Sequence, residues 1–425
     1  MNTYEEVLDF LYSALPMYQR VGKSAFTKDL TNTYKLVAAL GNPHKLFKSV
    51  HIAGTNGKGS SSHILSSILQ QAGYKTGLYT SPHLKNFTER IRVDGQEIPQ
   101  SEVVAFVNSC HDSILEIEPS FFEMTVAMAF AYFAKVEVDI AVIEVGLGGR
   151  LDSTNVIQPE VSLITNIGYD HQDILGETLP EIAAEKAGII KENTPAVISE
   201  YQEEIWSVFY ETAKKKEAPL INASTEYHIS EEAQKLSIKT PTTTLDNINM
   251  DVQGKYQTKN LVGVLAVVDQ LRELGYQITD QDIRLGLQHI SSNTGLKGRW
   301  QILGEHPTIV CDTAHNEEGI SLVLAQLAST EHEHCHIVWG MVKDKHIEKV
   351  LKLLPPKASY YFTQSKVPRA LDAKTLQERA KSYDLIGNSY SEVNMAIEAA
   401  KRAAKPADVI FIGGSTFVVA EINEL

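Results

Sequence analysis

HIAGTNGKGS, residues 51–60, is the stretch of sequence that decides the fold. Apolar residues before it predict the end of a strand, and the helical spacing of apolar residues in Ser61–Gln71 predicts a helix after it. The three glycines between them allow a tight turn whose backbone N–H groups point one way, and Lys58 adds a full positive charge. A strand, a glycine-rich turn and a helix N-terminus in this order predict a phosphate-binding loop.

This loop is a variant of the P-loop. The pattern GxxxxGK[ST] requires glycine where the chain has Ile52, and serine or threonine where it has Gly59. The alternative is an ordinary strand-to-helix turn, in which a lysine between two glycines would have little structural use. We therefore expect a phosphate loop of an unusual kind.

Composition limits the classes of protein to which the chain can belong. With 425 residues, 43% of them apolar and 22% charged, it has the composition of a globular protein of two or three domains. A net charge of −14 argues against non-specific binding of nucleic acid, which needs a basic surface. A polyanionic ligand would therefore be held by local cations and metal ions.

The spacing of the cysteines and the shortness of the apolar runs favour a cytoplasmic location for the protein. The three cysteines, Cys110, Cys311 and Cys335, form no CxxC motif, which fits a reducing compartment. Early acidic residues argue against a signal peptide, and the longest apolar run, Met124–Ala134, is too short to span a bilayer. We expect a cytoplasmic protein with no membrane or nucleic-acid partner, and a monomer.

Strands that alternate with helices predict an α/β fold with a doubly wound, mostly parallel sheet. The continuous apolar strand Val138–Glu144 is typical of such sheets, whereas Tyr227–Gln253 reads as a small antiparallel hairpin insert. We take the polar segment Ser291–Arg299 as a linker. The domains expected are residues 1–295, with the insert at about 225–255, and a second, smaller Rossmann-like α/β domain at 296–425.

The expected helices include Tyr4–Ala14, Leu30–Leu40, Glu102–Leu115, Phe121–Ala134, Leu179–Ile190 and Thr258–Gly275. The expected strands of the second domain are Thr308–Asp312, His336–Gly340, Ser359–Thr363 and Val409–Gly413.

Polar residues follow several predicted strands, and ligands of open α/β sheets bind at the carboxyl ends of strands. Lys58, Ser81, Glu144, His171 and Asp312 all take such positions. Glu144 stands directly after VDIAVI, where a P-loop protein holds Mg²⁺; its alternative is a capped strand end. A lone histidine is more often structural than a ligand, so a structural role is the alternative for His171.

A second group of residues could suggest a metal site. His332, His334, Cys335 and His336 lie close together, but their spacing fits no standard zinc pattern. We therefore interpret them as an exposed junction between a helix and a strand.

Several motifs follow one another along the chain: HIAGTNGKGS (51–60), TSPHL (80–84), FFEMT (121–125), EVGLGGRLDSTN (144–155), GYDH (168–171), EIAAEKAGIIK (181–191), KGRW (297–300), DTAHN (312–316) and PRAL (368–371). Together they resemble folylpolyglutamate synthase, including the bifunctional bacterial dihydrofolate synthases, a family that belongs with the muramyl ligases. The resemblance runs from about Tyr18 to the C-terminus, and it departs from the family at Thr313, where glycine is usual, and at Ser61, where threonine is usual.

The resemblance implies ATP and two Mg²⁺ ions as cofactors. It implies that Ser81 and Glu144 bind the first ion, and that His171 and a carbamylated Lys186 bind the second. The residues that it implies for the ATP phosphates are Gly57, Lys58, Gly59 and Ser60.

Other positions take their expected roles from the same resemblance. Asn260 should approach the adenine, Arg299 the phosphates and Asp312 the ribose. The incoming glutamate should lie near His315 and Ser415. The pterin should lie near Phe121, Phe122, Leu151 and Asp152.

We therefore expect an ATP-dependent carboxylate–amine ligase that adds L-glutamate to folates, and also to dihydropteroate, through an acyl phosphate. Lys58, Lys186, His171 and His315 are its expected catalytic residues. One alternative is a muramyl-type amino-acid ligase, against which FFEMT and TSPHL argue. The other is a P-loop nucleotide switch, which would carry a guanine-reading NKxD motif, and the sequence has none.

Overall fold

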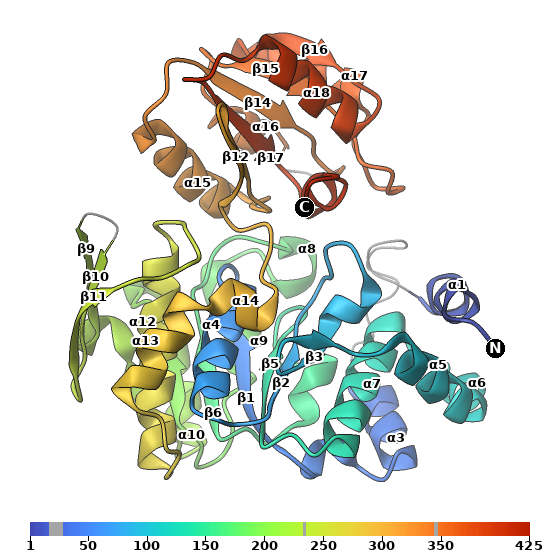
Figure 1. Cartoon of the computed structure of the whole chain (residues 1–425). Helices are drawn as coiled ribbons and strands as arrows, with labels where there is room; N and C mark the ends of the chain where they lie inside the picture. The colour runs from blue at the N-terminus through green and yellow to red at the C-terminus, as the bar shows by residue number, and fades with distance from the viewer. Residues whose placement is uncertain (17–28, 233–234, 344–346) are drawn as a thin grey trace. The chain divides into compact units, whose positions relative to one another are not determined.

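A computed structural model of the chain describes residues 1–16, 29–232, 235–343 and 347–425. Tyr18, where the resemblance was expected to begin, lies outside these residues. Contacts between Cα atoms divide the chain into two compact units: residues 1–251 with 257–295, and residues 252–256 with 296–425 (Figure 1).

The first unit is built on a mostly parallel sheet with the strand order β4-β3-β2-β5-β1-β6-β7-β8. Only the β2–β3 and β3–β4 pairs are antiparallel among these strands. β1 lies between β5 and β6, so the phosphate loop that follows β1 leaves from the middle of the sheet. The strands are β1 (Lys48–Ala53), β2 (Thr76–Tyr79), β3 (Ile91–Val93), β4 (Gln96–Glu97), β5 (Ile140–Glu144), β6 (Val161–Ile164), β7 (Ala196–Ile198) and β8 (Leu220–Asn222).

Helices cover both faces of this sheet, because successive strand residues point to opposite faces. α4 (Lys58–Gln71) packs on β1, β2 and β5, and α12 (Gln257–Glu273) packs on β6 and β7. α7 (Phe121–Lys135) joins Ala141 and Ile143 in one apolar cluster, and α9 (Leu179–Ala187) joins Ile164 and Ile198 in another.

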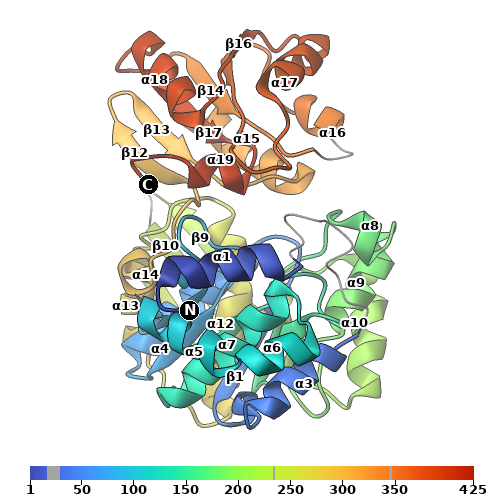
Figure 2. The same ribbon diagram turned by 90° about the vertical axis from the view of Figure 1, so that its right-hand side faces the viewer.

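The remaining helices of this unit surround these layers, and Figure 2 shows α1, α5 and α6 together on one side of it. They are α1 (Tyr4–Ala14), α3 (Thr31–Ala39), η2 (Pro43–Lys45), η3 (Phe87–Arg90), α5 (Gln100–Ser109), α6 (His111–Ile117), η4 (Ser153–Val156), α8 (Gln172–Leu175), α10 (Glu203–Lys215), α11 (Ala223–Glu226), α13 (Asp280–Gln288) and α14 (Ile290–Thr294).

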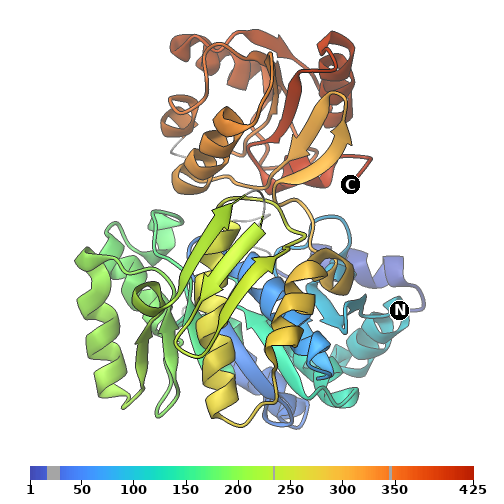
Figure 3. The ribbon, with the colours of Figure 1, turned by 60° about the vertical axis from the view of Figure 1, so that its left-hand side comes forward.

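The predicted antiparallel insert is a three-stranded sheet rather than a single hairpin. Its strands β9 (His228–Glu232), β10 (Lys235–Lys239) and β11 (Thr244–Ile248) have the order β11-β10-β9. The sheet packs on α12 and α13 (Figure 3). Leu236 and Ile238 are buried, while Ser237 between them is exposed, so one face of the insert turns to the core.

The second unit holds a six-stranded sheet with the order β12-β13-β17-β14-β15-β16, in which only the β12–β13 pair is antiparallel. Its strands are β12 (Gln301–Glu305), β13 (Thr308–Cys311), β14 (Cys335–Trp339), β15 (Ser359–Phe362), β16 (Gly387–Ser389) and β17 (Val409–Gly413). Its helices are α15 (Glu317–Ser329), α16 (Ile347–Leu351), α17 (Ala373–Ala380), η5 (Lys381–Tyr383), α18 (Val393–Ala403) and α19 (Thr416–Ala420).

Two predicted segments differ from the structure. The helix expected over Glu102–Leu115 is two helices, α5 and α6, that meet at Cys110, whose φ of −106° and ψ of 12° leave the helical region. The linker expected over Ser291–Arg299 is wrong in its first half, which belongs to α14. The Asp251 carboxylate accepts hydrogen bonds from the backbone N–H groups of Ile290 and Ser291, which favours a helix start there.

Within the described ranges, no helix combines the length and the apolar character needed to cross a membrane.

Candidate active site

The phosphate loop needs glycine for steric reasons. A Cβ atom on Gly54, whose φ is +150°, would lie 1.8 Å from Oγ1 of Thr165, and one on Gly57 would lie 2.1 Å from Oδ1 of Asn260. Gly57 has a φ of 82° and directly precedes α4, so the loop leads into a helix N-terminus. Asn260, the residue expected near adenine, therefore lies against the loop.

Lys58 folds back over this loop. Its Nζ donates hydrogen bonds to the backbone carbonyl oxygens of Gly54 at 2.9 Å and Thr55 at 3.1 Å. The next strand end braces the loop, because backbone N–H groups of Thr55 and Asn56 donate to Asn166 at 2.9 Å each. The ammonium group thus stands over a preformed turn. Gly59 and Ser60 form the first turn of α4, where Ser60 is buried.

Glu144 and Ser81 meet at the same edge of the sheet. Glu144 ends β5 and pairs in register with Ile52 of β1, close to the start of the loop. Its side chain is buried, and its Oε2 accepts a hydrogen bond of 3.0 Å from the backbone N–H of Ser81. The ends of β2 and β5, which are neighbours in the sheet, therefore bring Ser81 to the Glu144 carboxylate, and β1 on the other side of β5 leads into the loop that carries Lys58.

Lys186 is an unusual lysine, because only 4% of it is exposed. Burial lowers the pKa of its ammonium group to about 7, and the positive charge of Lys58 acts in the same direction. Neighbouring Glu185 forms an ion pair of 2.7 Å with Arg150. In the described part of the chain, no ion pair within 4.0 Å involves Lys186, which disfavours a simple Lys186–Glu185 pair.

His171 lies in the loop after β6 and begins α8 with a φ of 48°. Its Nε2 is 3.7 Å from Oδ1 of Asp170, and its backbone N–H donates to the same oxygen at 2.8 Å. Asp170 in turn acts electrostatically on Lys186. Asp170 therefore links the two residues: it contacts His171 and its negative charge acts on Lys186.

Asp152 organises the segment that follows Glu144. Its buried carboxylate accepts hydrogen bonds from the backbone N–H groups of Leu147 at 2.8 Å and Thr154 at 3.0 Å, and from Thr154 Oγ1. Burial raises the pKa of Asp152, although these hydrogen bonds oppose the shift. The side chain therefore fixes the conformation of the glycine-rich turn.

The aromatic residues expected near the pterin differ in position. A Cβ on Gly146 would lie 2.3 Å from the ring of Phe122, so this ring packs on the turn that Asp152 fixes. Phe121 is buried and lies against Tyr12 and Phe87, with the guanidinium carbon of Arg90 5.3 Å from its ring centre. Leu151 is half-buried in the same turn.

The second unit has its own cluster of the expected residues around Asp312, directly after β13. The buried Asp312 carboxylate accepts hydrogen bonds from Tyr256 Oη at 2.6 Å and from the backbone N–H groups of Trp300 and Ala314, each at 2.8 Å. Burial raises the pKa of Asp312, and Tyr256 opposes the shift. Arg299 donates to Thr313 Oγ1, so the hydroxyl that replaces the usual glycine contacts the arginine.

His315 and Ser415 follow neighbouring strands of this unit. His315 lies after β13, with its Nδ1 3.2 Å from the carbonyl oxygen of Thr313, and Ser415 lies after β17. Ser415 is buried, and its Oγ caps α19 by accepting from the N–H of Phe417 at 3.2 Å. Because β13 pairs with β17, both residues lie at the carboxyl edge of this sheet.

Sequence reasoning missed several residues that hold these groups in place. Tyr256 carries no motif and is distant in sequence from Asp312. Arg90 is buried and donates from Nε to Nδ1 of His83 at 2.8 Å, but only its place in the strand-end segment after TSPHL could have indicated it. Asn166, which braces the phosphate loop, lies just after β6 and could have been found by the strand-end argument.

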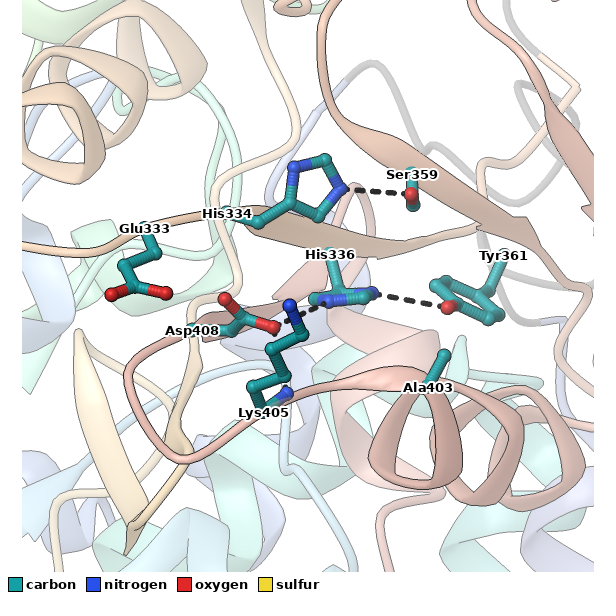
Figure 4. Close-up of a pocket in the computed structure, with 8 residues that line it drawn as sticks. All are labelled: Glu333, His334, His336, Ser359, Tyr361, Ala403, Lys405 and Asp408. Atoms are coloured by element: carbon teal, nitrogen blue, oxygen red, sulfur yellow. Dashed lines mark hydrogen bonds and ion pairs between the residues drawn. The ribbon is translucent and has the colours of Figure 1, made fainter.

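The histidine cluster lies elsewhere, at the amino-terminal ends of β14 and β15 and next to Asp408, which precedes β17. It borders a cavity of about 440 Å³, and several side chains that line this cavity form hydrogen bonds with one another (Figure 4). His334 Nε2 lies 2.9 Å from Ser359 Oγ, and His336 lies 3.0 Å from Tyr361 Oη and 3.3 Å from Asp408.

The prediction of an exposed junction is not confirmed for Cys335 and His336, the two residues of this cluster that lie in β14. Cys335 is half-buried, and His336 is a buried strand residue. Burial lowers the pKa of His336, while Asp408 opposes the shift. Among the described residues, no group of three or more histidine, cysteine or acidic side chains is arranged to hold a metal ion.

Two family models match most of the chain. The model of the Mur ligase middle domain matches residues 52–268, and that of the Mur ligase glutamate ligase domain matches residues 298–416. A dihydrofolate synthase/folylpolyglutamate synthase from Bacillus subtilis is 35% identical over 409 residues, which cover 92% of this chain and 93% of that protein.

Two solved structures resemble the chain over nearly its whole length. E. coli FolC in complex with DHPP and ADP has a TM-score of 0.87 at 31% identity and covers 99% of this chain and 96% of its own. A bifunctional folylpolyglutamate synthase/dihydrofolate synthase with Mn, AMPPNP and L-glutamate bound has a TM-score of 0.85 at 29% identity and covers 99% and 97%.

Proposed function

The chain belongs to the folylpolyglutamate synthase/dihydrofolate synthase family of the Mur ligases, and from this premise we propose how its own residues ligate L-glutamate to folates. It is an ATP-dependent carboxylate–amine ligase. The observation that supports the proposed site best is the contact between Ser81 and the buried Glu144 carboxylate, beside the strand β1 that leads into the loop carrying Lys58.

The reaction has to turn a poor electrophile into a good one. A carboxylate resists attack by an amine, whereas an acyl phosphate, formed when the γ-phosphoryl group of ATP moves to the carboxylate oxygen, accepts it. The glutamate amine then forms the amide and phosphate leaves. Such an enzyme contributes mainly positioning and charge neutralisation.

We assign the phosphates to the loop of the first unit. Gly57, Gly59 and Ser60 lie at the N-terminus of α4, where backbone N–H groups favour anions, and Lys58 adds a mobile positive charge. Asn260 borders Gly57 and is proposed to contact the adenine.

The residues at the strand ends fit divalent cations. Glu144 supplies a buried carboxylate that accepts from the backbone N–H of Ser81, and carboxylate and hydroxyl oxygens are the hard donors that Mg²⁺ prefers. We propose Ser81 and Glu144 for a first ion, and His171 and a carbamylated Lys186 for a second. Such ions would supply positive charge against the ATP phosphates.

Substrate roles divide by unit. In the first unit we propose that Phe121, Phe122, Leu151 and Asp152 border the pterin. In the second unit we propose that Asp312 accepts from the ribose and Arg299 meets phosphate, while His315 and Ser415 approach the incoming glutamate. We further propose that the enzyme accepts both dihydropteroate and folate glutamates, acts as a monomer and works in the cytoplasm.

Phosphate release tests the function directly. We expect release from ATP only when L-glutamate and a pteroate compound are both present. The products from dihydropteroate and from tetrahydrofolate, separated by mass, show whether both activities belong to the chain. Phosphate release that ignores either substrate would contradict the assignment.

Glu144→Gln is expected to lower turnover by roughly a hundredfold while the protein stays folded. Glutamine keeps the shape and can still accept from the Ser81 N–H, but it loses the charge that favours Mg²⁺. Steady-state rates over a Mg²⁺ titration check this, with thermal unfolding as the measure of folding. Intact activity that is indifferent to Mg²⁺ would leave Glu144 as a strand-end residue only.

Asp312→Ala is expected to raise the KM for ATP roughly tenfold and the KM for folate much less, because a ribose acceptor acts equally in the ground and transition states. Asp312 also holds Tyr256, so Tyr256→Phe is the matched control that removes the same hydrogen bond from the other side. An equal rise in the KM for ATP in Tyr256→Phe would make the effect structural, and a selective rise in the KM for folate would move Asp312 to the other substrate.

A further inference from the structure

A short chain of hydrogen bonds joins the first strand to the turn after Glu144. His51, in β1, is fully buried, and its Nε2 lies 2.8 Å from Oγ1 of Thr154. The Thr154 hydroxyl in turn donates to Oδ1 of Asp152. Both histidine and threonine lie in the interior, so the chain His51–Thr154–Asp152 is shielded from water.

The direction of this chain is fixed by the hydrogens available. A carboxylate can only accept, and the Thr154 hydroxyl has a single hydrogen, which it gives to Asp152. Nε2 of His51 must therefore carry the hydrogen that Thr154 accepts. The other ring nitrogen, Nδ1, is buried and has no hydrogen-bond partner among the described residues.

The bare Nδ1 makes the opposite direction unfavourable. If the hydrogens were reversed, the proton of His51 would move to Nδ1, where a buried N–H donor would have no acceptor. Leaving a buried donor unsatisfied costs more than leaving one imidazole lone pair unused. The surroundings of His51 therefore keep Thr154 pointing toward Asp152.

We propose that His51 is a positioning residue for the folate pocket: through Thr154 it holds the Asp152 carboxylate as an acceptor, and thereby fixes the turn Gly146–Asp152. This rests on the proposed function, in which Phe122 and Leu151 of this region border the pterin. Asp152 transmits the effect because it also accepts from the backbone N–H of Leu147. Phe122 packs on Gly146 in the same turn.

Neighbouring charges agree with a neutral histidine. Burial lowers the pKa of His51 to about 3, and Lys191 acts in the same direction. Asp152, which accepts hydrogen bonds from Thr154, Leu147 and Gly146, also acts electrostatically on Lys186 and Tyr79. His51 is accordingly expected to stay in its Nε2–H form throughout the working pH range.

The kinetic test compares variants of the residues that form the hydrogen-bond chain His51–Thr154–Asp152. His51→Leu and Thr154→Val are expected to raise the KM for folate roughly tenfold, the size of one buried hydrogen bond to a charged group, and to leave the KM for ATP within about twofold. His51→Gln, which retains an N–H donor, and Thr154→Ser, which retains the hydroxyl, are expected to recover most of the loss. The double variant should lose no more than the worse single variant.

The matched control is His63→Leu. His63 is buried as His51 is, but it lies on the helix α4 of the first unit. Its Nδ1 lies 2.8 Å from the hydroxyl oxygen of Thr294, and this pair does not lead to Asp152. We expect a lower unfolding temperature with an unchanged KM for folate. If all three substitutions lower stability alike and none shifts the KM for folate, His51 has a structural role only and the proposal is overturned.

A spectroscopic readout separates this proposal from the function itself. In ¹⁵N-histidine-labelled wild-type protein, the His51 signals, assigned by their loss in His51→Gln, are expected to show the Nε2–H tautomer at every pH from about 6 to 9. The Nδ1–H tautomer would overturn the proposal even in an active enzyme. Wild-type protein that releases phosphate without folate or glutamate would instead overturn the function and leave the tautomer result standing.

Discussion

Lys58→Ala is expected to reduce turnover by roughly a thousandfold or more, since transferring a phosphoryl group requires fixed positive charge beside the phosphates. In the structure, Nζ of Lys58 reaches back over the loop to two carbonyl oxygens of Gly54 and Thr55. A phosphate is expected beside this loop, at the N-terminus of α4. ATP would replace these two bonds to neutral carbonyl oxygens with a bond between opposite charges.

The loss has to be separated from a structural effect, because Lys58 also closes the turn. Lys191→Ala is a suitable control: Lys191 is likewise partly buried in the first unit and donates to a backbone carbonyl, that of Asn155, at 2.7 Å. We expect both variants to lose a similar amount of stability in thermal unfolding, and only Lys58→Ala to lose ligation. Near-normal ATP-dependent ligation by Lys58→Ala would refute the interpretation of residues 51–60.

Much of the fold could be predicted because the informative patterns are local. The strand, glycine turn and helix at residues 48–71 and the apolar run before Glu144 depend on neighbours in sequence. Short edge strands depend on distant partners instead. β12, β8 and β16 were not predicted, because each is three to five residues long and has few or no fully buried residues.

The candidate site follows the same division. The rule that ligands bind at strand ends indicated Ser81 and Glu144, which the structure brings into contact. It could not indicate Tyr256, whose partner Asp312 lies 56 positions away. Nor could it show that the Asp152 carboxylate accepts hydrogen bonds from the backbone of its own turn, because that requires the coordinates of the turn.

Lys186→Arg is expected to be inactive, because we propose that Lys186 acts as a carbamate and arginine keeps a cation in its place. The structure supplies the conditions that this chemistry needs. Burial and Lys58 lower the pKa of Lys186 to about 7, so a large share of neutral amine is present at neutral pH and can attack CO₂. Glu185, the nearest alternative partner in sequence, is paired with Arg150.

The charge balance around Lys186 gives a pH dependence with a definite sign. Below a pH of about 7 the ammonium form predominates, and an ammonium group cannot react with CO₂. Activity in bicarbonate-free buffer is therefore expected to fall as the pH is lowered and to be restored in part by added bicarbonate. A rate that is indifferent to bicarbonate at pH 6 to 7 would count against the carbamate.

Lys186→Ala is a further test, because it removes both the ammonium cation and any carbamate anion at this position. If a carboxylate is what the site requires, acetate can occupy the vacated space and restore part of the activity of Lys186→Ala, whereas it cannot restore Lys186→Arg. Labelling with ¹³CO₂ provides the direct measurement, and Lys191 is the matched control, because burial also lowers its pKa, to about 8. We expect one carbamate signal that is lost in Lys186→Ala and kept in Lys191→Ala. An active Lys186→Arg enzyme, or a signal that follows Lys191, would show that a lowered pKa alone does not produce the modification and that Lys186 serves as a cation beside the phosphates.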